Sequence, residues 1–194
     1  MARTRDVEGQ RARLSAATWQ VLAEGGLSAL TLRAVAERAG CTTGLVLHAF
    51  PNKRALLLHA RQLLHERANS RADAIETRGG EPRAVLRDVL LAMLTTTAEG
   101  HDEARVWVSF LVECIGDREL CEVHVAGNRF FLERVTRLVQ ACRPRLNADA
   151  ARTAAVQLVG LMDGLNTLSV ADPESYSPDR QRAALDAAIA GITR

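Results

Sequence analysis

The segment TTGLVLHAFPNK, residues 42–53, gathers side chains suited to contacts with a nucleic acid. Thr42 and Thr43 supply hydroxyl groups, His48 supplies an imidazole, and Lys53 is the only lysine of the chain. Hydroxyl and imidazole groups hydrogen-bond phosphates or base edges, and an ammonium group pairs with a phosphate. Each residue alone could be a helix cap or a solvated surface group, so the prediction of DNA binding depends on their joint placement.

A helix-turn-helix would hold these groups along one exposed edge. Thr31 is a favourable N-cap for a short helix that stops at Gly40, where a left-handed turn is expected. A second helix then begins at Thr42 and ends before Pro51, because proline cannot continue it. This pattern predicts that the second helix meets the major groove of DNA.

Within the second helix, Val46 and Phe50 lie four residues apart and are predicted to face inward. Gly44 removes a side chain where the backbone must come close to DNA. Asn52 opens a further helix, whose positive dipole end suits a phosphate. The predicted DNA-binding residues are Thr31, Thr42, Thr43, Gly44, Leu47, His48, Asn52 and Lys53, together with Arg3 and Arg5. The two arginines would act from a flexible N-terminal arm, or else belong to a solvated charged tail.

The charges divide unevenly along the 194 residues. Residues 1–71 hold eleven basic and five acidic residues, whereas residues 72–194 hold fourteen and eighteen. A basic first part favours a polyanionic partner for that part. No secretory leader and no apolar run of about 20 residues is expected, and the four cysteines form no short-spaced framework. We therefore expect a cytoplasmic, nucleoid-associated protein without a membrane partner.

Helical periodicity dominates the chain, and aromatic residues make up only 4% of it. We predict an all-α fold of about nine helices, including one over residues 82–99 that a Gly100–His101 break separates from the next. A three-helix DNA-binding domain at residues 1–55 would precede a larger ligand-binding and dimerisation domain at residues 56–194.

The stretch TLRAVAERAGCTTGLVLHAFPNKRALL resembles the DNA-binding segment of TetR-family transcriptional regulators, over roughly residues 10–58. The resemblance implies an all-helical homodimer that binds a pseudo-palindromic operator and carries a small-molecule site in its larger domain. The C-terminal stretch around DGL resembles the branch of the choline-responsive repressor, which does not make choline the ligand here. Leu47 and Ala49 stand where many members have tyrosines that contact phosphates.

The second domain contains no nucleophile elbow, phosphate loop or paired zinc-ligand motif, so neither an enzyme nor a cofactor or metal is expected. Cys121 and His124, with Cys114 nearby, could sense a metal or an oxidant, although packing is the simpler interpretation. A pocket for a small effector is predicted between helices, and ordinary core is the alternative for each residue. Its candidate residues are Met93, Trp107, Phe110, Leu111, Cys114, His124, Asn128 and Phe131. Trp107 and Phe110 could form an aromatic cage for a cation.

The last two helices are predicted to pair with those of a second copy in a four-helix bundle. The candidate dimerisation residues are Val156, Val159, Leu161, Met162, Leu165, Leu168, Leu185 and Ile189. The function expected from all these features is a repressor that binds a palindromic operator as a dimer and is released by an effector. The alternative is a helical ligand-binding or scaffold protein with weakened operator binding.

Overall fold

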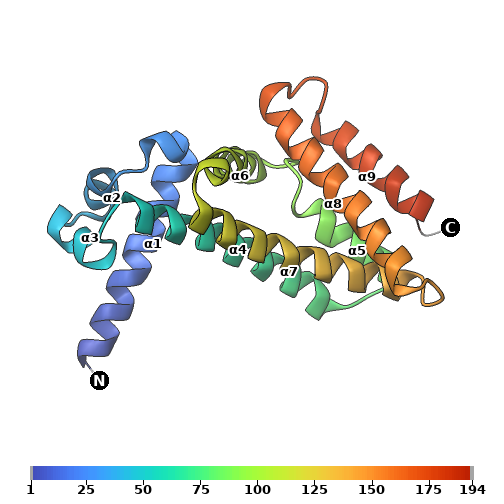
Figure 1. Ribbon diagram of the computed structural model, residues 1–194, viewed down its shortest axis with the longest axis horizontal. Helices are drawn as coiled ribbons and strands as arrows, with labels where there is room; N and C mark the ends of the chain where they lie inside the picture. The colour runs from blue at the N-terminus through green and yellow to red at the C-terminus, as the bar shows by residue number, and fades with distance from the viewer. Residues whose placement is uncertain (1, 193–194) are drawn as a thin grey trace. The chain divides into compact units, whose positions relative to one another are not determined.

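The computed structural model describes residues 2–192, with side chains from residue 9 onward. These residues fold into nine α-helices without a strand, which confirms the all-α prediction for this part of the chain (Figure 1). The helices are α1 (Ala2–Ala29), α2 (Leu32–Ala39), α3 (Thr43–Ala49), α4 (Lys53–Arg78), α5 (Pro82–Leu91), α6 (Ala98–Gly116), α7 (Arg118–Cys142), α8 (Ala148–Ala171) and α9 (Pro178–Ile192).

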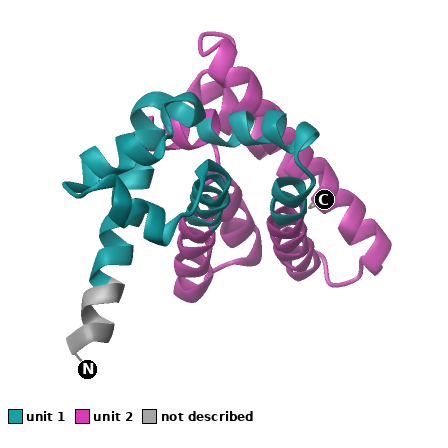
Figure 2. Ribbon diagram, turned by 60° about the vertical axis from the view of Figure 1, so that its left-hand side comes forward, with its two compact units in different colours: residues 1–65, 106–124 teal, residues 66–105, 125–194 magenta. Residues whose placement is uncertain are grey.

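The chain forms two compact units (Figure 2). Unit 1 comprises Met1–His65 and Val106–His124, and unit 2 comprises Glu66–Arg105 and Val125–Arg194. Both units are discontinuous in sequence, because α4, α6 and α7 each contribute to both. The units are defined by packing within one chain, so the functional domains at residues 1–55 and 56–194 stay a prediction.

Unit 1 packs the first helices around one apolar core. The fully buried side chains include Leu14, Leu30, Val35, Val46 and Leu56, which come from α1 to α4 and the connections between them. The segment 106–124 adds further apolar residues to the same core. The first long helical run breaks at Gly26, whose φ of 65° no longer fits a right-handed helix. The core therefore fixes α2 and α3 against α1, and leaves one side of α3 to solvent.

Unit 2 contains a second core, which α5, α8 and α9 share with the later part of α7. The helix expected over residues 82–99 ends at Leu91, and Gly100–His101 lies inside α6, so both predictions are wrong. Two local features favour the start of α6 at Ala98. Thr97 Oγ1 accepts a hydrogen bond from Gly100 N at 3.0 Å and thereby caps the start of α6. A Cβ at Gly100, in the first turn of α6, would lie 2.7 Å from the carbonyl oxygen of Leu94. Only glycine therefore fits this position without a shift of the preceding turn.

By length and composition, α8 could cross a membrane, contrary to the expectation from its sequence. Core helices of soluble proteins meet the same criterion, and eight residues of α8 are buried within the chain, from Ala151 to Ser169. This packing accounts for part of the apolar character of α8, and Val156 and Leu168 stay exposed.

Candidate nucleic-acid interface and buried sites

The turn between α2 and α3 has the geometry expected of a helix-turn-helix. Thr31 caps α2, because its Oγ1 accepts a hydrogen bond from Ala34 N at 3.0 Å. Gly40 ends α2 in the left-handed region, with φ 62° and ψ 41°. Glycine occupies this region without the steric cost that a Cβ brings. The predicted cap and the predicted turn residue are therefore both confirmed.

The α3 helix separates a buried side from an exposed one. Val46 and Phe50 are buried in the core of unit 1, as their spacing predicts. Thr42 caps the helix, since its Oγ1 accepts a hydrogen bond from Leu45 N at 3.3 Å. The exposed residues of this segment are Thr42, Thr43, Gly44, Leu47, His48 and Ala49. Every residue of α3 proposed to contact DNA is therefore accessible to a partner.

The start of α4 adds a cationic group beside this segment. Phe50 is extended, with φ −131°, as expected for a residue that precedes proline. Asn52 Oδ1 accepts a hydrogen bond from Ala55 N at 2.8 Å, so Asn52 caps α4. Lys53 follows in the first turn and is exposed. Arg3 and Arg5 lie outside the residues whose side chains are described, so their role stays a prediction.

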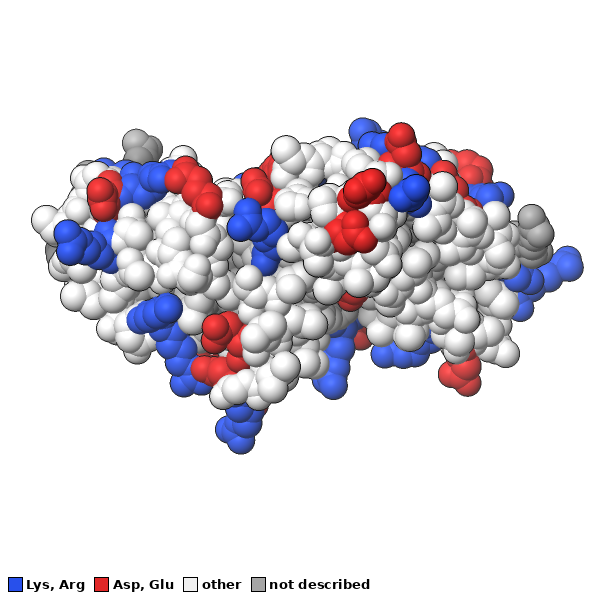
Figure 3. Space-filling model, turned by 90° about the horizontal axis from the view of Figure 1, so that it is seen from above, with Lys and Arg blue, Asp and Glu red and all other residues white. Residues whose placement is uncertain are grey.

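Charge does not gather by sign on the face of the molecule seen in Figure 3, where basic and acidic side chains are interspersed. Several of the arginines form ion pairs within unit 1. Arg38 pairs with Glu24, and Arg54 pairs with Asp117 at 2.7 Å. Two hydrogen bonds hold the pKa of the Asp117 carboxyl below its usual range. The larger effect comes from the backbone of Leu120, and the next from the guanidinium of Arg54. The charges of these two arginines are therefore partly neutralised by carboxylates of their own unit.

A buried arginine forms the centre of a second group of side chains in unit 1. Arg61 of α4 is 0% exposed, and its Nε donates to His124 Nδ1 at 3.1 Å. The guanidinium carbon lies 4.6 Å from the centroid of the Trp107 ring and 6.0 Å from that of Phe110. Trp107 also stacks on His124, with ring centroids 4.5 Å apart. A ligand cation at Trp107 would therefore meet a resident cation, which weakens the expectation of an aromatic cage for a cation.

Two neutral histidines accompany Arg61. Burial, together with the charge of Arg61, lowers the pKa of His65 to about 3 and that of His124 to about 4. Both imidazoles are consequently neutral near pH 7. Arg61 and His65 were not among the predicted site residues, although their spacing of four residues places them on one side of α4.

The predicted effector residues are distributed over both units. Unit 1 brings together Trp107, Phe110, Cys114 and His124, whereas Met93, Asn128 and Phe131 belong to unit 2 and Leu111 is exposed. Cys114 is half-buried, and burial raises the pKa of its thiol, which does not favour a reactive thiolate. No group of three potential metal ligands occurs among the residues that the structure describes.

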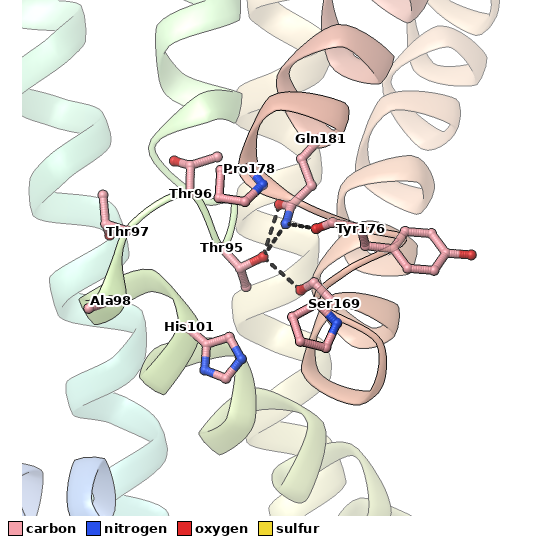
Figure 4. Close-up of a pocket in the computed structure, with 10 residues that line it drawn as sticks. Thr95, Thr96, Thr97, Ala98, His101, Ser169, Tyr176, Pro178 and Gln181 are labelled. Atoms are coloured by element: carbon pink, nitrogen blue, oxygen red, sulfur yellow. Dashed lines mark hydrogen bonds between the residues drawn. The ribbon is translucent and has the colours of Figure 1, made fainter.

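Unit 2 contains a cavity of about 250 Å³ that the sequence analysis did not anticipate (Figure 4). Its lining comes from the turn before α6, the first residues of α6, the end of α8, the connection that follows it, and the start of α9. The lining residues are Thr95, Thr96, Thr97, Ala98, His101, Ser169, Pro173, Tyr176, Pro178 and Gln181.

A hydrogen-bond network occupies the inner wall of this cavity. Thr95 Oγ1 lies 2.7 Å from Ser169 Oγ and accepts from Gln181 Nε2 at 2.6 Å. Gln181 Nε2 also donates to the Tyr176 carbonyl at 2.7 Å, while the Tyr176 ring points away from the network (Figure 4). Asn166 Oδ1 accepts from Thr95 N at 3.1 Å. The network joins the turn before α6 to α8 and α9. Its buried polar groups therefore hydrogen-bond one another and stabilise the packing of these three elements.

The predicted dimerisation residues fall into a buried and an accessible set. Met162, Leu165, Leu185 and Ile189 are buried in the core of unit 2 and present little surface to a second copy. The accessible set consists of exposed Val156 and Leu168 with half-buried Val159 and Leu161. The division arises because α8 and α9 must first bury one side within their own chain.

Family comparisons agree with this geometry. Residues 14–60 match the family described as "Bacterial regulatory proteins, tetR family", and residues 82–194 match "BetI-type transcriptional repressor, C-terminal". The HTH-type transcriptional regulator BetI of Burkholderia thailandensis is 34% identical over 164 residues, which span 81% of this chain and 80% of that protein. The HTH-type transcriptional regulator PksA of Bacillus subtilis is 28% identical over 176 residues, spanning 90% and 85%.

Solved structures share the fold over nearly the whole chain. A transcriptional regulator from Rhodococcus sp. superposes with a TM-score of 0.82 at 29% identity, covering 93% of this chain and 94% of that one. A regulator from Saccharomonospora viridis in complex with choline has a TM-score of 0.84 at 21% identity, covering 95% and 96%. At that identity the likeness shows the fold alone. The chain therefore belongs to the tetR family of bacterial transcriptional regulators, a family of DNA-binding proteins rather than enzymes, and carries a BetI-type C-terminal domain.

Proposed function

We propose that this regulator is a repressor that binds a palindromic operator as a homodimer and leaves it when a small effector binds. The observation that carries the proposal is the exposed side of α3, with Lys53 of α4 beside it, on a rigid apolar support. Paired recognition helices about 34–36 Å apart would enter successive major grooves of a palindrome. We expect the protein to act in the cytoplasm, where that DNA lies.

The dimer is supported by an accessible strip along α8. Val156 and Leu168 are exposed, and Gly160 and Gly164 lie between them with open space where a Cβ would be. Glycines four residues apart allow two helices to approach closely, and the flanking apolar side chains gain by leaving water. The exposed Ala183 and Ala187 give α9 a small-residue face of the same kind.

The effector is expected to act through the helices that carry Arg61 and the side chains packed around it, Trp107 and His124. Arg61 and His65 lie on α4, the helix that begins next to α3 in sequence. A ligand that rearranged this group would change α4, and a coupling free energy of about 1–3 kcal/mol between the two sites suffices for a modest response. Choline, bound by the Saccharomonospora viridis regulator, is the first compound to test, and the like charge of Arg61 argues for weak binding.

Selection from a random library of duplexes tests the function directly. The full-length protein should enrich a two-fold symmetric sequence and bind it at least about a thousandfold more tightly than random DNA at fixed moderate salt. The Thr43→Val variant keeps the shape of the side chain but removes its hydroxyl, and should weaken this binding. Enrichment of no sequence would reject the repressor and favour a ligand-binding protein that has lost its operator.

A further inference from the structure

Leu47 has an exposure that the fold does not explain. It is 43% exposed, and it is the only large apolar side chain of residues 31–53 that is exposed. Leu30, Val35, Val46 and Phe50 all pack into the core of unit 1. A single exposed leucine is common on a protein surface and by itself calls for no partner. Leu47 is of interest because it lies on the side of α3 that is proposed to enter the major groove.

Helical spacing places Leu47 in the centre of the accessible side of α3. Residues three and four apart share a side, which joins Gly44 to Leu47 and His48, while Val46 points into the core. Gly44 has no side chain to hold the helix away from a partner, and an added Cβ would meet only Thr42 Oγ1, at 3.9 Å. A partner that contacts the backbone at Gly44 therefore also reaches the tip of Leu47.

The chemistry of this side limits how it can distinguish bases. The strongest base contacts in a major groove come from arginine to guanine and from asparagine or glutamine to adenine, and the exposed side of α3 has none of these residues. A leucine cannot hydrogen-bond a phosphate. The apolar group that base edges present in the major groove is the C5-methyl group of thymine.

We propose that Leu47 contacts the C5-methyl group of a thymine in each half of the operator, and so helps to select the sequence. The proposal depends on the proposed function, because it requires α3 in the major groove. It adds that the selected half-site contains a thymine whose identity is read through its methyl group.

Deoxyuridine in place of thymidine tests this contact, since it removes the methyl group and leaves base pairing unchanged. The probe is the duplex most enriched by the wild-type protein, with each thymidine replaced in turn. Each half-site should contain one thymidine whose replacement, in that half-site alone, weakens wild-type binding about fourfold through the loss of one buried methyl group. Replacement in both half-sites should weaken binding about fifteenfold, since the two contacts are well separated.

The Leu47→Ala variant should bind the thymidine and deoxyuridine duplexes equally well. Alanine favours the helix and Leu47 makes no core contact, so this variant should fold. Val112→Ala, which removes an apolar side chain that is 65% exposed on α6, should keep the wild-type sensitivity. A bound duplex without a methyl-sensitive thymidine, or a sensitivity that persists in Leu47→Ala, would overturn the proposal and leave the repressor intact. Failure of the wild-type protein to enrich any duplex would remove both.

Discussion

Gly44 offers a substitution in which folding and DNA binding should change in opposite directions. In Gly44→Ala, the new Cβ would lie in open space apart from Thr42 Oγ1 at 3.9 Å, which is ordinary van der Waals contact. The backbone of Gly44 does not have positive φ, so alanine fits its conformation. Alanine stabilises a helix by about 0.5–1 kcal/mol relative to glycine, and the lower end applies to a helix of seven residues.

The same methyl group would stand on the side of α3 that is proposed to face DNA. Inserting a methylene into a closely packed contact costs about 1–3 kcal/mol, which corresponds to at least about a fivefold loss of affinity. We therefore expect Gly44→Ala to unfold at a higher urea concentration than the wild type and to bind the selected duplex more weakly. Far-UV circular dichroism at one fixed protein concentration and fluorescence anisotropy at one fixed salt concentration measure the two effects.

Gly116→Ala is the matched control, because Gly116 is also exposed, also helical, and also has open space around the position of a Cβ. It lies at the end of α6, away from α3 in the sequence, and should leave DNA affinity unchanged. If Gly44→Ala bound DNA as tightly as the wild type, the backbone of α3 would not approach DNA at Gly44, and the argument from its missing side chain would be refuted.

Three further predictions concern charge, assembly and pH. Lys53→Gln should reduce the slope of log affinity against log salt concentration by about 0.9 for each copy of the chain on DNA. The control Arg145→Gln, in the turn after α7, should leave that slope unchanged. An unaltered slope in Lys53→Gln would exclude a contact between Lys53 and a phosphate. Gly160→Leu should fold normally but should dissociate the dimer at micromolar concentration, as sedimentation equilibrium would show. A dimer as stable as that of the wild type would exclude the accessible strip of α8 as the dimer interface. The pKa values of His65 and His124 are lowered to about 3 and 4, so the unfolded chain binds more protons than the folded one below pH 6.5. Stability should therefore fall as pH decreases from 6.5 toward 4, by at most about 1.4 kcal/mol per pH unit for each histidine and by less for half-buried His65. A urea midpoint that stayed constant from pH 7 to 5 would contradict this prediction.

Local features of the sequence predict the helix-turn-helix almost completely. The caps at Thr31, Thr42 and Asn52, the left-handed turn at Gly40 and the break at Pro51 all follow from interactions within a few residues. Such interactions do not depend on the rest of the fold. The sequence pattern alone therefore indicates both where these helices start and that their exposed side is available to DNA.

The later helices depend on partners that lie far away in the sequence. Thr95 is buried because Asn166, Ser169 and Gln181 satisfy its polar atoms, and this ends the helix that the sequence predicts through residue 99. Arg61 can be buried because aromatic rings from α6 and His124 of α7 surround it.

On α8, apolar residues occur all around the helix, so their pattern does not tell the side that packs within the chain from the side open to a second copy. The sequence by itself determined the class of the protein and the geometry of its DNA-binding segment, because short-range sterics and hydrogen bonds control both. Only the tertiary structure decided which polar groups are buried and which apolar ones stay exposed, because burial is a property of the packed chain.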